Sequence, residues 1–271
     1  MSAEELLRAG DLQGAAAKLK EAVRAKPADP KLRTFLFQLF CIQGEWTRAV
    51  AQLAVVAELD PLAIPMAQMY REAIGCEMLR AEIFAGKRSP SIFGDPPAWI
   101  GSLVQALPQF AAGKIAAAES LRDQAFEQAP TSIGRVNDTE FEWLADADPR
   151  LGPVMEVIVN GRYYWAPLEV IAAIDIDEPE DLRDSVWLPA HFTWSNGGEV
   201  VGLIPTRYPG SEANADPLVA LARKTLWELS GGLELPVGQR TLTTDAGEFA
   251  LMDVRRLEFG AAEESTAEAA E

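Results

Sequence analysis

The spacing of apolar residues changes from helical to alternating part-way along the chain. After Gly10, apolar side chains recur three or four positions apart, at Leu12, Ala16, Leu19 and Val23, as on one face of a helix. From Val154 apolar and polar residues alternate, which is typical of half-buried β-strands. We therefore expect an α-helical N-terminal part followed by a β-rich C-terminal part.

The helical part contains a repeated unit that begins with glycine and ends with proline. Its copies are Gly10–Pro27, Gly44–Pro61 and Gly113–Pro130, and the proline lies 17 positions after the glycine in each. The first two copies begin 34 residues apart, which is the period of tetratricopeptide-type repeats of paired helices. Glycine ends the preceding helix at low steric cost, and proline cannot continue the helix that follows. We expect a tetratricopeptide-like helical domain over residues 1–132.

A methionine-rich helix lies between the second and third copies. It is expected within Pro61–Gly86 and carries Met66, Met69 and Tyr70. Methionines at helical spacing usually belong to an adaptable core, and less often they line a groove that accepts a partner helix. A break rich in proline and glycine follows at 87–97 and interrupts the array.

The second half predicts a small antiparallel β-barrel-like domain with one helix, so the fold class is α+β. Residues 133–152 are expected to be a helical or irregular connector, and residues 153–259 the β domain. Asn160-Gly161 favours a tight hairpin turn. Strands are expected at 170–177, 186–194, 199–204, 239–243 and 248–259, a helix at 216–229, and a disordered acidic tail at 260–271.

Negative charge is concentrated in the second half of the chain. The formal net charge is −17, of which residues 1–150 carry −4 and residues 151–271 carry −13. This acidity argues against nucleic acid and anionic membranes as partners, because phosphate binding needs Lys and Arg. A basic or amphipathic protein partner is compatible with it. No stretch predicts a membrane span or a secretory signal, so we expect a cytoplasmic protein with free thiols at Cys41 and Cys76.

The sequence contains no catalytic, cofactor or metal motif that the spacing supports. The single histidine, His191, cannot by itself complete a zinc site. Asp175-x-Asp177 begins like a calcium loop, but Glu180 stands where the turn requires glycine. We expect no cofactor, no metal and no enzymatic activity. One alternative remains open, a hydrolase that uses acidic residues of the 175–184 loop together with His191.

Three stretches of the second half stand out together: Gly161–Ala190, Ile204–Ser211 and Gly238–Phe259. In this order they resemble the ImpE/SciE/TagJ family, accessory proteins of bacterial type VI secretion, and the resemblance covers essentially the whole chain. It implies a non-enzymatic adaptor that binds the N-terminal helix of the small contractile-sheath subunit, associates indirectly with the recycling ATPase, and helps sheath assembly or recycling. Stacked helix pairs suit a helical partner. A promiscuous chaperone-like holder of several partners is the other alternative.

Candidate partner-binding residues come from the methionine-rich helix and from the stretches that resemble the family. Tyr, Trp and Arg are favoured at interfaces, although aromatic residues on a curved sheet more often belong to its core. The acidic loop is also a candidate docking patch for a basic segment. The candidates are Met66, Met69, Tyr70, Tyr163, Tyr164, Trp165, Asp181, Arg183, Trp187, Arg207 and Tyr208.

Overall fold

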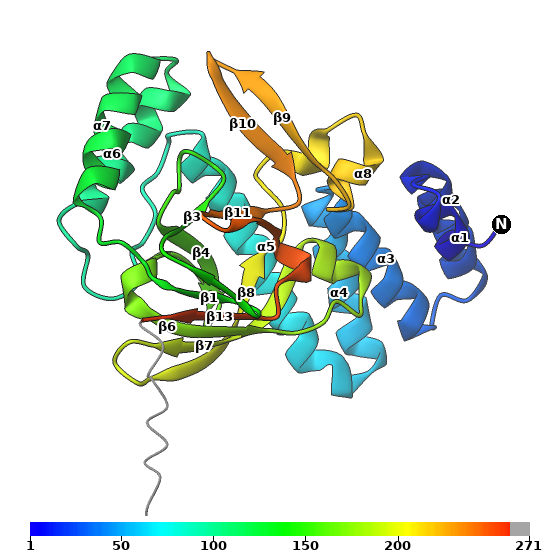
Figure 1. The fold of residues 1–271 in the computed structure, drawn as a ribbon. Helices are drawn as coiled ribbons and strands as arrows, with labels where there is room; N and C mark the ends of the chain where they lie inside the picture. The colour runs from blue at the N-terminus through cyan, green and yellow to red at the C-terminus, as the bar shows by residue number, and fades with distance from the viewer. Residues whose placement is uncertain (261–271) are drawn as a thin grey trace, which may run out of the picture.

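A computed structural model of the chain describes residues 1–260. Within them, seven helices precede a set of antiparallel sheets, so the predicted α+β class is confirmed (Figure 1). The tail expected at 260–271 lies, apart from Gly260, outside the described residues. None of the helices in this range is long and apolar enough to cross a membrane.

The repeat glycines end helices in the structure as the sequence predicts. Gly10, Gly44 and Gly113 have φ of +82°, +68° and +69°, the left-handed conformation that glycine adopts without penalty. Ser2 and Glu5 form the capping box at the start of the first helix. The helices are α1 (Ala3–Arg8), α2 (Leu12–Ala25), α3 (Pro30–Ile42), α4 (Trp46–Leu59), α5 (Ile64–Phe84), α6 (Ile100–Ala111) and α7 (Ile115–Gln128).

The main sheet of the β domain has eight strands in the order β2-β1-β13-β6-β7-β8-β4-β5. A three-stranded sheet, β12-β11-β3, and a two-stranded ribbon, β10-β9, complete the domain. The strands are β1 (Gly134–Val136), β2 (Thr139–Phe141), β3 (Leu144–Asp146), β4 (Val154–Val159), β5 (Arg162–Pro167), β6 (Ile171–Ile176), β7 (Trp187–Trp194), β8 (Glu199–Pro205), β9 (Thr225–Ser230), β10 (Leu233–Gly238), β11 (Thr241–Thr244), β12 (Gly247–Ala250) and β13 (Arg256–Phe259).

The predicted turn at Asn160-Gly161 joins β4 to β5, and both residues have positive φ, as this kind of turn requires. The prediction of a helix at 216–229 is wrong beyond the first turn. Only Pro217–Ala220 is helical (α8), since Ala222 takes a left-handed conformation and ends it. Residues 225–230, which include β-branched and aromatic side chains, pair instead with β10 across Gly231-Gly232.

Two further expectations differ from the structure. The stretch expected to be a helical or irregular connector contains β1, β2 and β3, which pair into the sheets of the β domain. The strand expected at 248–259 is divided by a short 3-10 helix, Leu251–Asp253, and its two parts belong to different sheets. In both cases strand pairing over long sequence separations decides the structure, and local patterns do not report such pairing.

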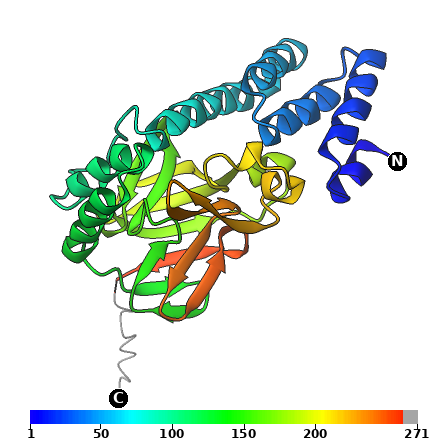
Figure 2. The same cartoon turned by 90° about the horizontal axis from the view of Figure 1, so that it is seen from above.

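The helical and β halves share one hydrophobic core. Figure 2 shows α5 lying along the β domain, with the first four helices extending beyond it. Aromatic rings from both halves meet at this junction: Tyr70 and Trp187 lie 5.8 Å apart between ring centroids, and Phe84 and Trp165 lie 6.0 Å apart. Trp46 of α4 packs on the same Trp187 ring at 6.1 Å. The two halves are therefore held as one unit at α5.

Candidate partner-binding site

Six of the eleven candidate residues are buried, five of them where the two halves meet. They are no more than 3% exposed: Tyr70, Tyr163, Trp165, Trp187, Arg207 and Tyr208. Side chains enclosed by their own chain have no surface to offer a partner. Five of the six join the two halves, and Tyr208, whose hydroxyl donates to the Thr241 carbonyl, stabilises the β half.

A buried ionic network centred on Glu156 ties α5 to the sheet. Glu156 lies on β4 and is fully buried. Its carboxylate accepts hydrogen bonds from Arg80 Nε at 2.6 Å and Nη2 at 2.8 Å, and also from Arg240 and the Tyr163 hydroxyl. Arg240 also pairs with Asp146 of β3. Two arginines and two carboxylates thus neutralise one another inside the protein.

The same network extends along α5 to an aromatic candidate. Glu77 Oε2 lies 3.4 Å from Arg80 Nη1, and Glu77 Oε1 accepts a hydrogen bond from the Trp187 indole Nε1 at 3.0 Å. The Trp165 indole donates to the Tyr163 hydroxyl at 2.8 Å. Each polar edge of these aromatic residues therefore has a partner inside the junction, as buried Trp and Tyr require.

Two arginines of the β half bond the C-terminal carbonyl groups of repeat helices. Arg207 donates to the carbonyl oxygens of Cys41 and Ile42 at the end of α3, each at 2.8 Å. Arg223 donates to the carbonyl oxygens of Leu7 and Arg8 at the end of α1, at 3.0 and 3.2 Å. Carbonyl groups in the last turn of a helix lack an amide donor four residues on, and a cation there interacts favourably with the helix dipole. The Leu7 and Cys41 carbonyls also accept hydrogen bonds from the Gly10 and Gly44 amides, at 3.0 and 3.2 Å. The β domain thus caps both helices.

Burial and the neighbouring arginines act in opposite directions on Glu156. Burial raises the pKa of this carboxyl, but the guanidinium groups of Arg80 and Arg240 outweigh it and lower the pKa to about 2. For Asp146 burial prevails over the attraction of Arg240, and the pKa rises to about 6. Glu156 is therefore the carboxylate whose ionised form stabilises the fold.

A pH dependence of stability results from the lowered pKa of Glu156. The ordinary pKa of Glu is 4.5, so below that value the unfolded chain binds a proton that the folded chain does not. Between pH 5 and pH 3 the wild type is expected to lose about 2 kcal/mol more unfolding free energy than Glu156→Gln. Urea unfolding of both proteins at both pH values measures this difference. Because both proteins contain Asp146, the comparison isolates the contribution of Glu156. Equal losses would contradict the assigned role of Glu156.

The other five candidates retain exposed surface. Met69 is 42% exposed, and Met66 and Tyr164 are half-buried. Asp181 is exposed and pairs with Arg183 at 2.5 Å, and the Arg183 guanidinium lies 4.9 Å from the centre of the Tyr70 ring. The acidic loop therefore lies beside the junction, and its charges are partly satisfied there.

The structure also shows exposed apolar residues that the sequence did not single out. Near Met69, at the corner between α4 and α5, Leu62 is 91% exposed and Ile64 is 49% exposed, and Met78 further along α5 is 58% exposed. A cleft of about 480 Å³ lies beside them, lined by Ala57 and Glu58 of α4 and by residues of α5 from Ile64 to Glu72. One feature of the sequence could have indicated this exposed surface: the third repeat copy begins later than the 34-residue period predicts.

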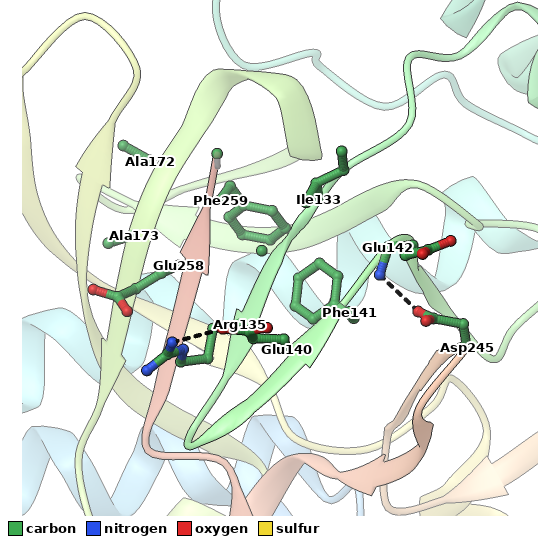
Figure 3. Close-up of a pocket in the computed structure, with 12 residues that line it drawn as sticks. Ile133, Arg135, Glu140, Phe141, Glu142, Ala172, Ala173, Asp245, Glu258 and Phe259 are labelled. Carbon is green, nitrogen blue, oxygen red and sulfur yellow. Dashed lines mark hydrogen bonds and ion pairs between the residues drawn. The ribbon is translucent and has the colours of Figure 1, made fainter. Parts of the chain in front are cut away.

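Another cavity, of about 820 Å³, lies on the β domain (Figure 3). Its walls come from β1, β2, β6 and β13, and Phe141 and Phe259 line it. At its wall Arg135 of β1 pairs with Glu140 of the adjacent strand β2 at 3.0 Å, and Asp245 accepts a hydrogen bond from the Glu142 backbone at 2.8 Å. None of the eleven candidates lines this cavity.

The residues of the hydrolase alternative do not line that cavity either. Asp175 and His191 are cross-strand neighbours on β6 and β7, but Asp175 pairs with Arg256 at 2.6 Å. The nearest acidic partner of His191 is Glu199, at 3.9 Å. Asp181 pairs with Arg183. Over residues 1–260 no group of three or more His, Cys, Asp or Glu side chains is arranged to hold a metal ion.

The chain is similar to known proteins along nearly its whole length. A family model described as ImpE protein matches residues 138–258, and a tetratricopeptide repeat model matches residues 6–73. The chain is 53% identical over 259 residues to the type VI secretion system accessory component TagJ of Pseudomonas aeruginosa, covering 96% of this chain and 91% of that protein. A crystal structure of protein VPA1032 from Vibrio parahaemolyticus matches with a TM-score of 0.85 at 27% identity, covering 95% of this chain and 97% of that chain.

Proposed function

The chain belongs to the ImpE family, and we propose that it is an accessory component of type VI secretion that acts by binding a helix of a partner protein. The observation that carries the proposal is the 53% identity to TagJ over nearly the full length of both proteins. The repeat helices supply the binding surface, because stacked helix pairs form clefts in which a partner helix can pack.

The partner in this proposal is the small contractile-sheath subunit, bound through its N-terminal helix. The chain would meet the recycling ATPase only indirectly, through the sheath, and would act in the cytoplasm during sheath assembly or recycling. Binding rather than catalysis is supported by the pairing of Asp175 and Asp181 with arginines and by the absence of His191 from the cavity in Figure 3.

Calorimetric titration of the whole chain with a peptide that copies this sheath helix tests the proposal. We expect saturable binding with one peptide per chain and a Kd in the micromolar range, because an isolated peptide must also be ordered as a helix on binding. A scrambled peptide of the same composition is the control. No binding at several hundred micromolar peptide would exclude direct capture of this helix.

A further inference from the structure

The repeat array stops one helix short of a third complete copy. Adding the period of 34 residues to α3 (Pro30–Ile42) places its counterpart in the first part of α5, and the counterpart of α4 at residues 80–93. Those residues hold the end of α5 and the break after it, so α5 has no second helix of its own. The tetratricopeptide match also ends within α5, at residue 73.

One face of α5 is bare in the incomplete repeat. On α3, Phe37, Gln38 and Cys41 are no more than 6% exposed: Phe37 packs on Tyr70 of α5 with 5.6 Å between ring centroids, and Arg207 of the β half donates to the Cys41 carbonyl. Their counterparts 34 residues later are exposed: Arg71, Glu72 and Gly75. The face that is covered in the second repeat is thus uncovered in the incomplete third repeat.

Two clefts along the repeat array also differ by one helix. A cleft of about 290 Å³ lies among α2, α3 and α4. Three of its lining residues recur at the 34-residue period in the larger cleft between α4 and α5, so that Val23, Arg24 and Arg33 correspond to Ala57, Glu58 and Ala67. In the first cleft α4 supplies a further wall, and in the second the helix that would supply it is absent.

We propose that an amphipathic helix of a partner protein packs into this place beside α5 and completes the third repeat. We name the place the vacant slot and define it by Ala57 of α4 and by Ile64, Ala67, Arg71 and Gly75 of α5. The proposal rests on the proposed function, because it names the surface on which the partner helix is held.

The second helices of the other repeats show which side chains a partner helix in the vacant slot needs. In α2, α4 and α7 the residue five positions after the repeat glycine is a fully buried alanine: Ala15, Ala49 and Ala118. In α2 and α4 a buried leucine follows four positions later, Leu19 and Leu53. The occupant is therefore a helix of about four turns, as long as the 14 residues of α2 or α4, with a small residue followed by a large aliphatic one at i+4.

The surface of the slot suits such a helix. Nothing lies within 4 Å of a Cβ built on Gly75, so a partner helix can approach the α5 backbone closely there. Exposed Ile64 and Met78 lie on the same helix and supply apolar contact. The charged side chains of the cleft are Glu58, Arg71 and Glu72, which leave one net negative charge, so the apolar stripe contributes more than net charge to the choice of occupant.

No helix of the described chain fills the slot. The next helices, α6 and α7, pack on each other, and Gly86 at the end of α5 lies against Pro108 and Ala111 of α6. The later repeat copy, which begins at Gly113, contains α7, and α6 directly precedes it. The occupant is therefore supplied by another molecule.

The substitution Gly75→Trp tests the slot, with Gly101→Trp as a matched control. Both glycines lie in helices, are exposed, and have nothing within 4 Å of a built Cβ. Replacing a helical glycine removes an unfavourable residue, so both variants should fold. The variants and the wild type are titrated with two fluorescent peptides, the sheath-helix copy and a copy of Trp46–Leu59. We expect Gly75→Trp to weaken binding at least tenfold and Gly101→Trp to leave it unchanged.

The two peptides separate the possible failures. If the wild type does not bind the sheath peptide but binds the Trp46–Leu59 copy in a Gly75-dependent way, the proposed function fails and the slot stands. If the sheath peptide binds wild type and Gly75→Trp equally, the function stands and the slot is overturned. If neither peptide binds the wild type, both proposals are overturned.

Discussion

Arg80→Met is expected to lower the free energy of unfolding by about 3–5 kcal/mol, as removal of one partner from a buried ion pair does. Arg80 is 2% exposed and is the cation that α5 supplies to Glu156 of the sheet. Methionine fills much of the volume but provides no charge. Glu77 and Glu156 then lose a shared partner, and Glu156 is fully enclosed by the protein. Chemical denaturation followed by tryptophan fluorescence measures the loss.

The control for this prediction is Arg88→Met. The Arg88 side chain is 64% exposed and pairs with Glu82 at 2.6 Å. Exposed ion pairs contribute about 0–1 kcal/mol, so this variant should unfold almost as the wild type does. A loss below about 1 kcal/mol for Arg80→Met, the level of an exposed pair, would show that the network does not join the two halves.

Trp187→Ala is expected to cost about 3–5 kcal/mol, the range for truncating a large buried aromatic residue. Its ring is fully buried between Tyr70 of α5 and Trp46 of α4, and its indole nitrogen donates to Glu77. The substitution leaves a cavity and an unpaired carboxylate oxygen at the same point. Thermal and urea unfolding should both report the loss.

Trp227→Ala provides the matching substitution at an exposed site. Trp227 lies on β9 and is 51% exposed. Surface substitutions away from caps and networks usually change stability by about 0.5 kcal/mol or less. Similar losses in the two tryptophan variants would contradict the assignment of Trp187 to the junction.

Local signals in the sequence predicted those parts of the fold that local chemistry decides. Ser2 with Glu5, the repeat glycines and Asn160-Gly161 each act over a few residues, and each is found in the expected conformation. The helix expected at 216–229 fails for the opposite reason. Asp216 does start a helix, but the pairing of β9 with β10 determines the structure of the residues after its first turn. Likewise β1 has three residues and pairs with β13, more than 110 positions away.

The candidate site was harder to predict because aromatic and charged residues serve interfaces and cores alike. Trp165, Trp187 and Arg207 fit either role in the sequence, and only their burial distinguishes the two. One signal of the buried network was available: Glu156 is the single charge within the apolar strand Val154–Val159. Its partner Arg80 was not predictable, since a helical arginine is ordinarily exposed.

The late start of the third repeat copy, which is visible in the sequence, has a counterpart in the structure. The delay of the third copy marks the missing second helix beside α5. The β domain covers the opposite side of α5 and caps α1 and α3 through Arg223 and Arg207. The array is thereby stabilised on one side and left open on the other, which gives a rigid support for an added helix.

Hydrogen exchange of the whole chain, with and without the intact small sheath subunit, tests the central claim most directly. We predict that binding slows amide exchange in residues 64–79 of α5 and at the end of α4, and leaves the β9–β10 ribbon and the cavity of Figure 3 unchanged. A sheath subunit lacking its N-terminal helix should produce no protection. Protection confined to the β domain, or no protection at saturating subunit, would contradict the account.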